Sequence, residues 1–213
     1  MRNLPFVSFL LVALLIAGVS CGKKLYSETR DPERALTGNE WRTPVPSDTT
    51  LIYKTGVDAY GRYISGLLII KSSDSDDYRL VFTTEMGMKL FDFEFREDKF
   101  LVHYCFDKLN KKPVIRLLEK DFSMMLFRDV RDQKVKVSAV EGLVRYLMKR
   151  DDELWRISID PDSRTPVSLE SLSPKGKDKR VIKYVYRGEP CPSEIHIDHA
   201  NLDLKMRLDL LKR

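Results

Sequence analysis

The sequence predicts a mainly β protein with some helix, built on one antiparallel sheet. From Leu51 onward, apolar residues recur mainly at every second position, which is the period of a strand with one buried face. Short polar turns separate these stretches at the spacing of hairpins, so neighbouring strands should be antiparallel. One stretch shows clear helical periodicity, and we expect that helix to lie across the sheet.

The strand pattern is clearest in the first half of the domain, where phenylalanines alternate with charged residues. Phe91, Phe93 and Phe95 fall on one face of a strand, and Asp92 and Glu94 fall on the other. This alternation predicts a strand with one buried face and one polar face. The stretches with strand periodicity in this half are residues 64–70, 80–82, 91–96 and 100–106.

The predicted helix lies between two sets of strands. Apolar residues from Val114 to Met125 recur at helical spacing, and Pro113 stands in the first turn, where proline is tolerated. After the helix the pattern returns to a period of two. We expect the later strands at residues 143–149, 154–159, 167–172, 181–186, 194–198 and 204–210.

The N-terminus has the order of a secretory signal. Arg2 is followed by an apolar run, and small residues precede Cys21. The segment resembles a bacterial lipoprotein signal peptide, which implies removal of residues 1–20 and acyl chains such as palmitate on Cys21. A retained membrane helix is the alternative, but the run is shorter than the roughly 20 residues that span a bilayer, and it contains Pro5.

The rest of the chain divides into a lipidated tether, residues 21–50, and one domain, residues 51–213. The tether is polar and proline-bearing, with no sustained apolar period. Only Leu36 and Trp41 indicate that part of it docks on the body. The resemblance to bacterial lipoproteins also brings a sorting rule, under which Gly22 after the cysteine favours the outer membrane. We therefore expect an outer-membrane anchor and a domain facing the periplasm.

Charge and cysteine content restrict the partners. The chain has 37 basic and 32 acidic side chains, a net charge of +5. In a secreted protein this balance indicates a solvated surface, with attraction to anionic lipid headgroups as a second interpretation and no nucleic acid partner. Cys105 and Cys191 would lie in an oxidising compartment, where a disulfide between them could form. The spacing does not determine whether their Cα atoms come close enough.

The sequence offers little that is typical of an enzyme. It contains no nucleophile elbow, phosphate-binding glycine loop or HExxH motif. His196 and Asp198 share a strand face, but no third ligand is evident for a metal. We expect no catalysis, no metal and no cofactor.

The chain carries the short motifs SGLLII (residues 65–70), YRLVF (78–82), MGMKL (86–90) and PSEIHI (192–197), the last followed by the alternation of residues 204–210. Together these motifs resemble those of lipoprotein-sorting proteins of the LolA/LolB type. The likeness implies a strongly curved, incomplete antiparallel barrel whose concave apolar face is covered by one or more helices and holds acyl chains. The outer-membrane receptor of this type is itself a lipoprotein, which fits Cys21.

Two interpretations of the covered face stay open, a ligand cavity and a solid core. Both need the same apolar side chains, and methionines on the helix would suit variable apolar ligands. Met86 and Met88 flank Gly87 in a loop, where we expect them exposed to a membrane or a partner. The side chains expected to bind the ligand are Leu80, Phe82, Phe91, Phe93, Phe95, Met124, Met125, Leu204, Met206 and Leu208.

The leading functional hypothesis is an outer-membrane lipoprotein that binds an acyl chain or a lipidated protein, with a role in lipoprotein localisation. The alternative is a non-catalytic accessory or scaffold lipoprotein of an envelope assembly with a filled core. In that case Leu67, Ile69 and Leu90 should form an exposed apolar patch for a protein partner. A cavity of about 300 Å³ or more favours the first hypothesis.

Overall fold

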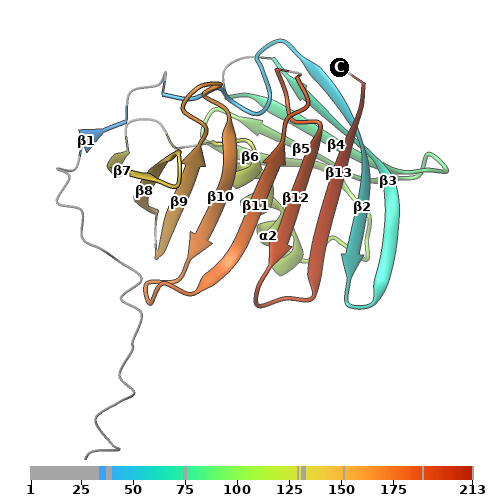
Figure 1. Ribbon diagram of the computed structural model, residues 1–213. Coiled ribbons are helices and arrows are strands. Elements are labelled where there is room, and N and C mark those ends of the chain that lie inside the picture. Colours follow the sequence, from blue (N-terminus) through green and yellow to red (C-terminus); the bar gives the residue numbers. More distant parts are fainter. Residues whose placement is uncertain are drawn as a thin grey trace, which may run out of the picture. The chain divides into compact units, whose positions relative to one another are not determined.

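The computed structural model contains one antiparallel sheet of 13 strands and one helix among the residues that it describes (Figure 1). These residues are 34–36, 40–73, 76–128, 130, 133–150, 152–188 and 190–212. The predicted signal peptide and Cys21 lie outside them. In the described part of the chain, no helix is both long enough and apolar enough to cross a membrane.

The elements follow one another as two sets of strands separated by the helix. The first set is β1 (Arg34–Ala35), β2 (Thr50–Ala59), β3 (Arg62–Ser72), β4 (Tyr78–Thr84), β5 (Lys89–Arg96) and β6 (Lys99–Cys105). Helix α2 spans Lys112–Met125. The second set is β7 (Lys134–Val140), β8 (Leu143–Arg150), β9 (Glu153–Ile159), β10 (Pro166–Leu172), β11 (Asp178–Val185), β12 (Glu194–His199) and β13 (Leu204–Lys212).

Most strands pair with their neighbours in the sequence, as the hairpin spacing predicts. The sheet order is β1-β7-β8-β9-β10-β11-β12-β13-β2-β3-β4-β5-β6. The last strand, β13, pairs with β2, with Leu208 opposite Thr55. This pairing joins the first meander, β2 to β6, to the second meander, β7 to β13, in one sheet. The described strands leave β1 and β6 at the two edges. The predicted mainly β, antiparallel fold with a helix is confirmed.

The buried face of the sheet follows the alternation that the sequence shows. Phe91, Phe93 and Phe95 are all buried, and Leu80 and Phe82 of β4 pair with Phe93 and Phe91. Such cross-strand apolar pairs stabilise neighbouring strands. The polar face of β5 holds one exception, because Asp92 is also buried.

Asp92 is buried without loss of its charge. Arg79 Nε and Lys89 Nζ donate hydrogen bonds to its carboxylate at 2.9 and 3.1 Å. The hydrogen bond from Arg79 is the main reason that the pKa of Asp92 is lowered from its ordinary value. A salt-bridged carboxylate thus replaces the exposed residue expected at this position.

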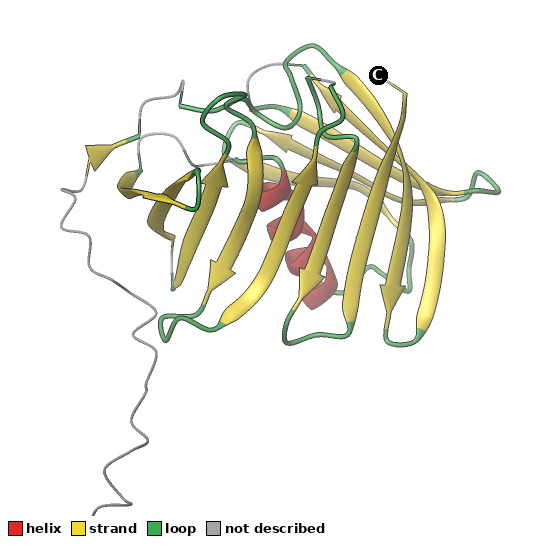
Figure 2. Cartoon of the chain, viewed as in Figure 1, coloured by secondary structure: helices red, strands yellow, loops and turns green. Residues whose placement is uncertain are grey.

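Helix α2 lies against the buried face of the sheet and contacts strands from both meanders (Figure 2). Proline stands in its first turn, as predicted. The rings of Phe122 and Phe91 of β5 lie 5.6 Å apart. On the other side, the hydroxyl of Tyr184 on β11 donates to the Met125 carbonyl at 3.0 Å. The helix therefore fills the space between β5 and β11.

The structure also shows three strands, β1, β2 and β7, that are not among the stretches expected from the sequence. Strand β7 alternates Val135 and Val137 with lysines, so a period of two was present in the sequence, and β1 adds two residues to its edge. Residues of the predicted tether dock beside these strands. Leu36 is buried, and Trp41 lies 5.0 Å from the ring of Tyr146. The docking that Leu36 and Trp41 indicated is confirmed.

The possible disulfide is absent from the structure. Cys105 and Cys191 are both buried and are not joined. Cys105 ends β6 at the edge of the sheet, whereas Cys191 precedes β12. Six strands, from β12 through β13 and β2 to β5, separate these two positions in the sheet order.

Candidate functional site

The side chains expected to bind a ligand lie deep in the protein. All are buried, with exposed fractions between 0 % for Leu80 and 7 % for Leu204. All but Leu204 belong to one apolar core. Within it, the rings of Phe91 and Phe93 are stacked with centroids 4.4 Å apart. The structure brings these residues together in the core. That they bind a ligand there stays a prediction.

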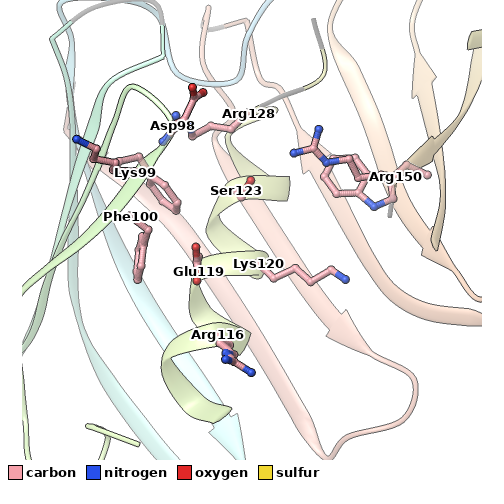
Figure 3. A pocket seen from close by; sticks show the side chains of 11 residues that line it. Asp98, Lys99, Phe100, Arg116, Glu119, Lys120, Ser123, Arg128 and Arg150 are labelled. Atoms are coloured by element: carbon pink, nitrogen blue, oxygen red, sulfur yellow. The ribbon is translucent and has the colours of Figure 1, made fainter. Parts of the chain in front are cut away.

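A cavity of about 450 Å³ lies beside helix α2 (Figure 3). This volume is within the range of small-molecule sites. The cavity runs between α2, the β5–β6 hairpin and strands β8 and β9. Of the predicted ligand-binding residues, only Phe95 lines it. Its lining residues are Phe95, Asp98, Lys99, Phe100, Arg116, Glu119, Lys120, Ser123, Arg128, Arg150 and Trp155.

The wall of the cavity combines aromatic rings with basic side chains. The apolar part consists of Phe95, Phe100 and Trp155, and the first two rings are 4.9 Å apart. Five lining residues are basic and two are acidic, so the cavity is cationic. Figure 3 shows the side chains of α2 between Phe100 on one side and Arg150 on the other.

Arg128 is fixed at one end of the cavity. It is only 4 % exposed, and its guanidinium carbon lies 4.8 Å from the ring centroid of Phe95. Its Nη2 donates to the carbonyl of Glu97. A cation stacked on an aromatic ring and held by a carbonyl keeps its charge in a fixed place. Its Nε–H is buried and has no hydrogen-bond partner among the described residues.

Trp155 contributes a second buried N–H donor that has no acceptor among the described residues. Its side chain is 3 % exposed and lines the cavity from β9. The indole Nε1–H is buried, and no described residue accepts a hydrogen bond from it. Buried donors are almost always satisfied in proteins, so such a group points to a water or ligand atom at that position.

The remaining charges around the cavity are partly compensated. Lys120 Nζ lies 2.8 Å from Glu153 Oε1, and Lys179 lies 3.1 Å from the same oxygen. Burial by itself would raise the pKa of Glu153, but hydrogen bonds from Lys120, Ser171 and Lys179 outweigh burial and lower the pKa to about 2. Burial raises the pKa of Glu119, which faces Arg116. Glu153 thus anchors the cavity side of the helix to β9.

The opposite side of the helix is anchored by a buried charged cluster. Asp121 is fully buried, and its two carboxylate oxygens lie 2.5 Å from Arg180 Nε and 3.1 Å from His199 Nε2. Arg180 and His199 come from β11 and β12. This cluster ties α2 to the second meander. It could not be predicted from local patterns, because its three members lie far apart along the chain.

The loop between β4 and β5 matches the exposure predicted for it. Met86 is 97 % exposed and Met88 is 50 % exposed, and the φ of Gly87 is +81°, which glycine adopts without strain. The apolar patch expected for a scaffold is not present as predicted. Leu90 is buried, and Leu67 and Ile69 are half-buried.

Metal ligands do not converge in the part of the chain that the structure describes. No three His, Cys, Asp or Glu side chains there are grouped to hold an ion. His196 Nε2 lies 3.2 Å from Glu194 instead. His196 and Asp198 line a second, smaller cavity of about 260 Å³ with Lys205 and Arg207.

Sequence reasoning missed most of the cavity. One part of it was legible, because Arg116, Glu119, Lys120 and Ser123 form a polar stripe at helical spacing. The other walls come from β6, β8 and β9, and only the topology brings them to the helix. A polar stripe is ordinarily taken for a solvated face, so the signal does not distinguish a cavity from a surface.

Comparison with known proteins gives a fold but not a family assignment. No protein-family model matches the chain, and no curated protein matches it. Among solved structures, it is similar to the LolA superfamily protein NE2245 from Nitrosomonas europaea, with a TM-score of 0.51 and 11 % identity over 81 % of this chain and 87 % of that chain.

Two further structures show weaker likeness. One is described as an outer membrane lipoprotein-sorting protein domain from Vibrio parahaemolyticus, with a TM-score of 0.46 and 6 % identity over 76 % of this chain and 83 % of that chain. The other is the CwlD amidase with the GerS lipoprotein from Clostridioides difficile, with a TM-score of 0.35 and 18 % identity over 65 % of this chain and 86 % of that chain.

The likeness to the Nitrosomonas protein places this chain in the class of proteins with a LolA-like fold. The resemblance in the short motifs is thereby confirmed at the level of the fold, on the likeness to the Nitrosomonas protein.

Proposed function

We propose that this protein is a lipoprotein of the cell envelope that binds an acyl chain or a lipid-modified protein beside helix α2. The observation that carries the proposal is the cavity of about 450 Å³ in a LolA-like fold. Its wall of Phe95, Phe100 and Trp155 suits a hydrocarbon chain. Each CH₂ group removed from water contributes about 0.8 kcal/mol, so part of one chain is enough for micromolar affinity.

A curved sheet is part of this proposal. Helix α2 contacts Phe91 of β5 and, through Lys120, Glu153 of β9. Seven strands lie between β9 and β5 in the sheet order. At about 4.8 Å per strand, a flat sheet would hold them about 38 Å apart, which is more than the width of a helix of about 10–12 Å. These contacts support a sheet that bends around the helix as an incomplete barrel.

The membrane attachment completes the proposal. Acyl chains on Cys21 would hold the protein at the outer membrane, with the domain in the periplasm and no catalytic role. Two or three chains give stable anchoring, whereas one chain gives only marginal binding. The exposed Met86 and Met88 supply an apolar loop tip that suits contact with the membrane or with a lipidated protein.

Native mass spectrometry of the full chain, purified from membranes without added lipid, tests the binding activity. We expect a fraction of the protein to retain one noncovalent acyl-bearing molecule. The covalent mass should show acyl groups, which a Cys21→Ser variant loses together with membrane association. Protein that carries no such molecule, and takes none up from fatty acid or lipid, would contradict the proposal.

The scaffold hypothesis keeps one supporting observation. The core around Phe93 and Met125 is filled by buried side chains, as a protein without a deep ligand requires. It predicts copurification of an envelope protein with the acylated chain and no bound lipid. The same preparation therefore separates the two hypotheses.

A further inference from the structure

The charge of the cavity restricts the kind of ligand more than its volume does. An acyl chain alone needs only apolar walls, yet five of the lining residues are basic. Long basic side chains near an apolar wall are costly to desolvate unless a counter-charge is present. Glu153 provides one for Lys120, at 2.8 Å. For Arg128, no carboxylate lies within ion-pair distance among the described residues.

Two donors in the wall are buried and unused. The Trp155 Nε1–H and the Arg128 Nε–H have no acceptor in the described part of the chain. Both belong to side chains less than 5 % exposed, and both residues line the same cavity. The hydroxyl-bearing Ser123 lies between Arg128 and Arg150 in Figure 3. An oxyanion at this end would satisfy the two donors and balance the charge of Arg128.

We infer that the cavity is a site for an anionic amphiphile, a molecule in which carboxylate or phosphate oxygens adjoin a hydrocarbon chain. The oxyanion lies at the end formed by Arg128, Arg150 and the Trp155 N–H. The hydrocarbon lies along Phe95 and Phe100, the neighbouring aromatic wall. This inference rests on the proposed function and specifies its ligand: the chain that binds beside α2 carries a negative head.

The arrangement also sets which anion can enter. Asp98 and Glu119 line the cavity as well and would repel an anion that spread along its whole length. Burial raises the pKa of Glu119, so that carboxyl group is held less firmly in its charged form. Asp98 lies beside Arg128 in Figure 3, so a compact head at this end meets one carboxylate at most, whereas a polyanion that fills the cavity meets both. The site therefore favours an amphiphile with one charged head group on its hydrocarbon chain.

Calorimetric titration of the full chain with four soluble probes tests the inference. The probes are octyl phosphate and octanoate, both kept below their micelle concentrations, octanol below its solubility limit, and inorganic phosphate. We expect octyl phosphate or octanoate to bind at least about tenfold more tightly than octanol, and inorganic phosphate to bind more weakly than either. The stronger of the two anionic probes distinguishes a phosphate head from a fatty-acid head.

A variant and a matched control locate the binding. Arg128→Gln with Arg150→Gln should lower the affinity for the anionic probe at least about tenfold and leave octanol unchanged. The control, Arg42→Gln with Arg62→Gln, removes two exposed arginines outside the cavity and should change neither. Because Arg128 also packs on Phe95, Trp155→Phe serves as a second variant, which removes the N–H donor and keeps a smaller aromatic ring.

The outcomes separate this inference from the proposed function. If octanol binds as tightly as octyl phosphate and octanoate, the cavity takes a neutral chain: the inference is overturned and the proposed function stands. If inorganic phosphate binds as tightly as octyl phosphate, the aromatic wall has no role and the amphiphile assignment is wrong. If neither Arg128→Gln/Arg150→Gln nor Trp155→Phe weakens the anionic probe, the oxyanion does not lie at this end.

Discussion

The two sides of helix α2 differ in how closely side chains pack against them. On one side, Phe122, Met124 and Met125 are buried in a core packed with other apolar side chains. On the other, Arg116 and Lys120 border a cavity of about 450 Å³. The most buried apolar residues are those that close packing requires, and room for a ligand is found where long charged side chains replace them. Depth of burial and capacity for a ligand are therefore separate properties of this fold.

Phenylalanines on the two sides should differ most in their effect on stability. Phe93 is fully buried, so Phe93→Ala should lower the free energy of unfolding by about 3–5 kcal/mol through lost burial and a new void. Phe100 is half-buried at the cavity, and Phe100→Ala should cost only about 1–2 kcal/mol. Urea unfolding measures both. Equal losses would mean that the cavity wall is as tightly packed as the core.

The buried cluster on the core side should also matter strongly. Asp121→Ala leaves Arg180 charged and buried without its partner at 2.5 Å, and should destabilise the protein by about 3–5 kcal/mol. Adding Arg180→Met to that variant removes the uncompensated charge and should recover part of the loss. A double-mutant cycle by chemical unfolding gives the coupling. Full stability of Asp121→Ala would show that this cluster does not hold the helix.

On the cavity side, the anchor of the helix should depend on pH. The pKa of Glu153 in the folded protein is about 2, below its ordinary value of 4.5, so its contribution is present above pH 4.5 and is lost as the pH falls toward 2. Glu153→Gln should therefore cost about 1–2 kcal/mol at pH 7, a figure reduced for solvent screening, and almost nothing near pH 2. Unfolding across this pH range measures it, and a constant difference would contradict the assignment.

The smallest effect is expected at the charged rim of the cavity. Arg116 is exposed, and Arg116→Gln should change the free energy of unfolding by no more than about 0.5 kcal/mol. Thermal unfolding checks this value. A loss of unfolding free energy comparable to that of Phe100→Ala would show that Arg116 stabilises the fold, which contradicts a role limited to the surface of a ligand cavity.

Local periodicity explains what the sequence could predict. The alternation at Phe91, Phe93 and Phe95 and the helical spacing up to Met125 are visible within a few residues, and both elements formed where expected. Val135 and Val137 carried the same signal for β7, but the lysines between them and the short span made it weak. The exposure of Met86 followed from the glycine beside it.

The cavity could not be predicted in the same way. Trp155 and Phe100 read as ordinary strand residues, and no local pattern shows that β9 and the β5–β6 hairpin both reach α2. Periodicity identifies which side chains face inward, but it does not measure whether their volumes fill the interior. The core phenylalanines were therefore the natural candidates for the ligand, and the space lies beside them instead.

The two tryptophans of the chain allow a direct test of where a ligand binds. Trp155 lines the cavity, whereas Trp41 packs 5.8 Å from Phe127 and 5.0 Å from Tyr146 outside it. A bromine-bearing fatty acid quenches tryptophan fluorescence at short range, so Trp41→Phe and Trp155→Phe proteins report the two positions separately. We expect the fatty acid to quench the emission of Trp155 and to leave that of Trp41 unchanged. Quenching of Trp41 alone, or of neither residue under conditions where the fatty acid is bound, would contradict a site beside α2.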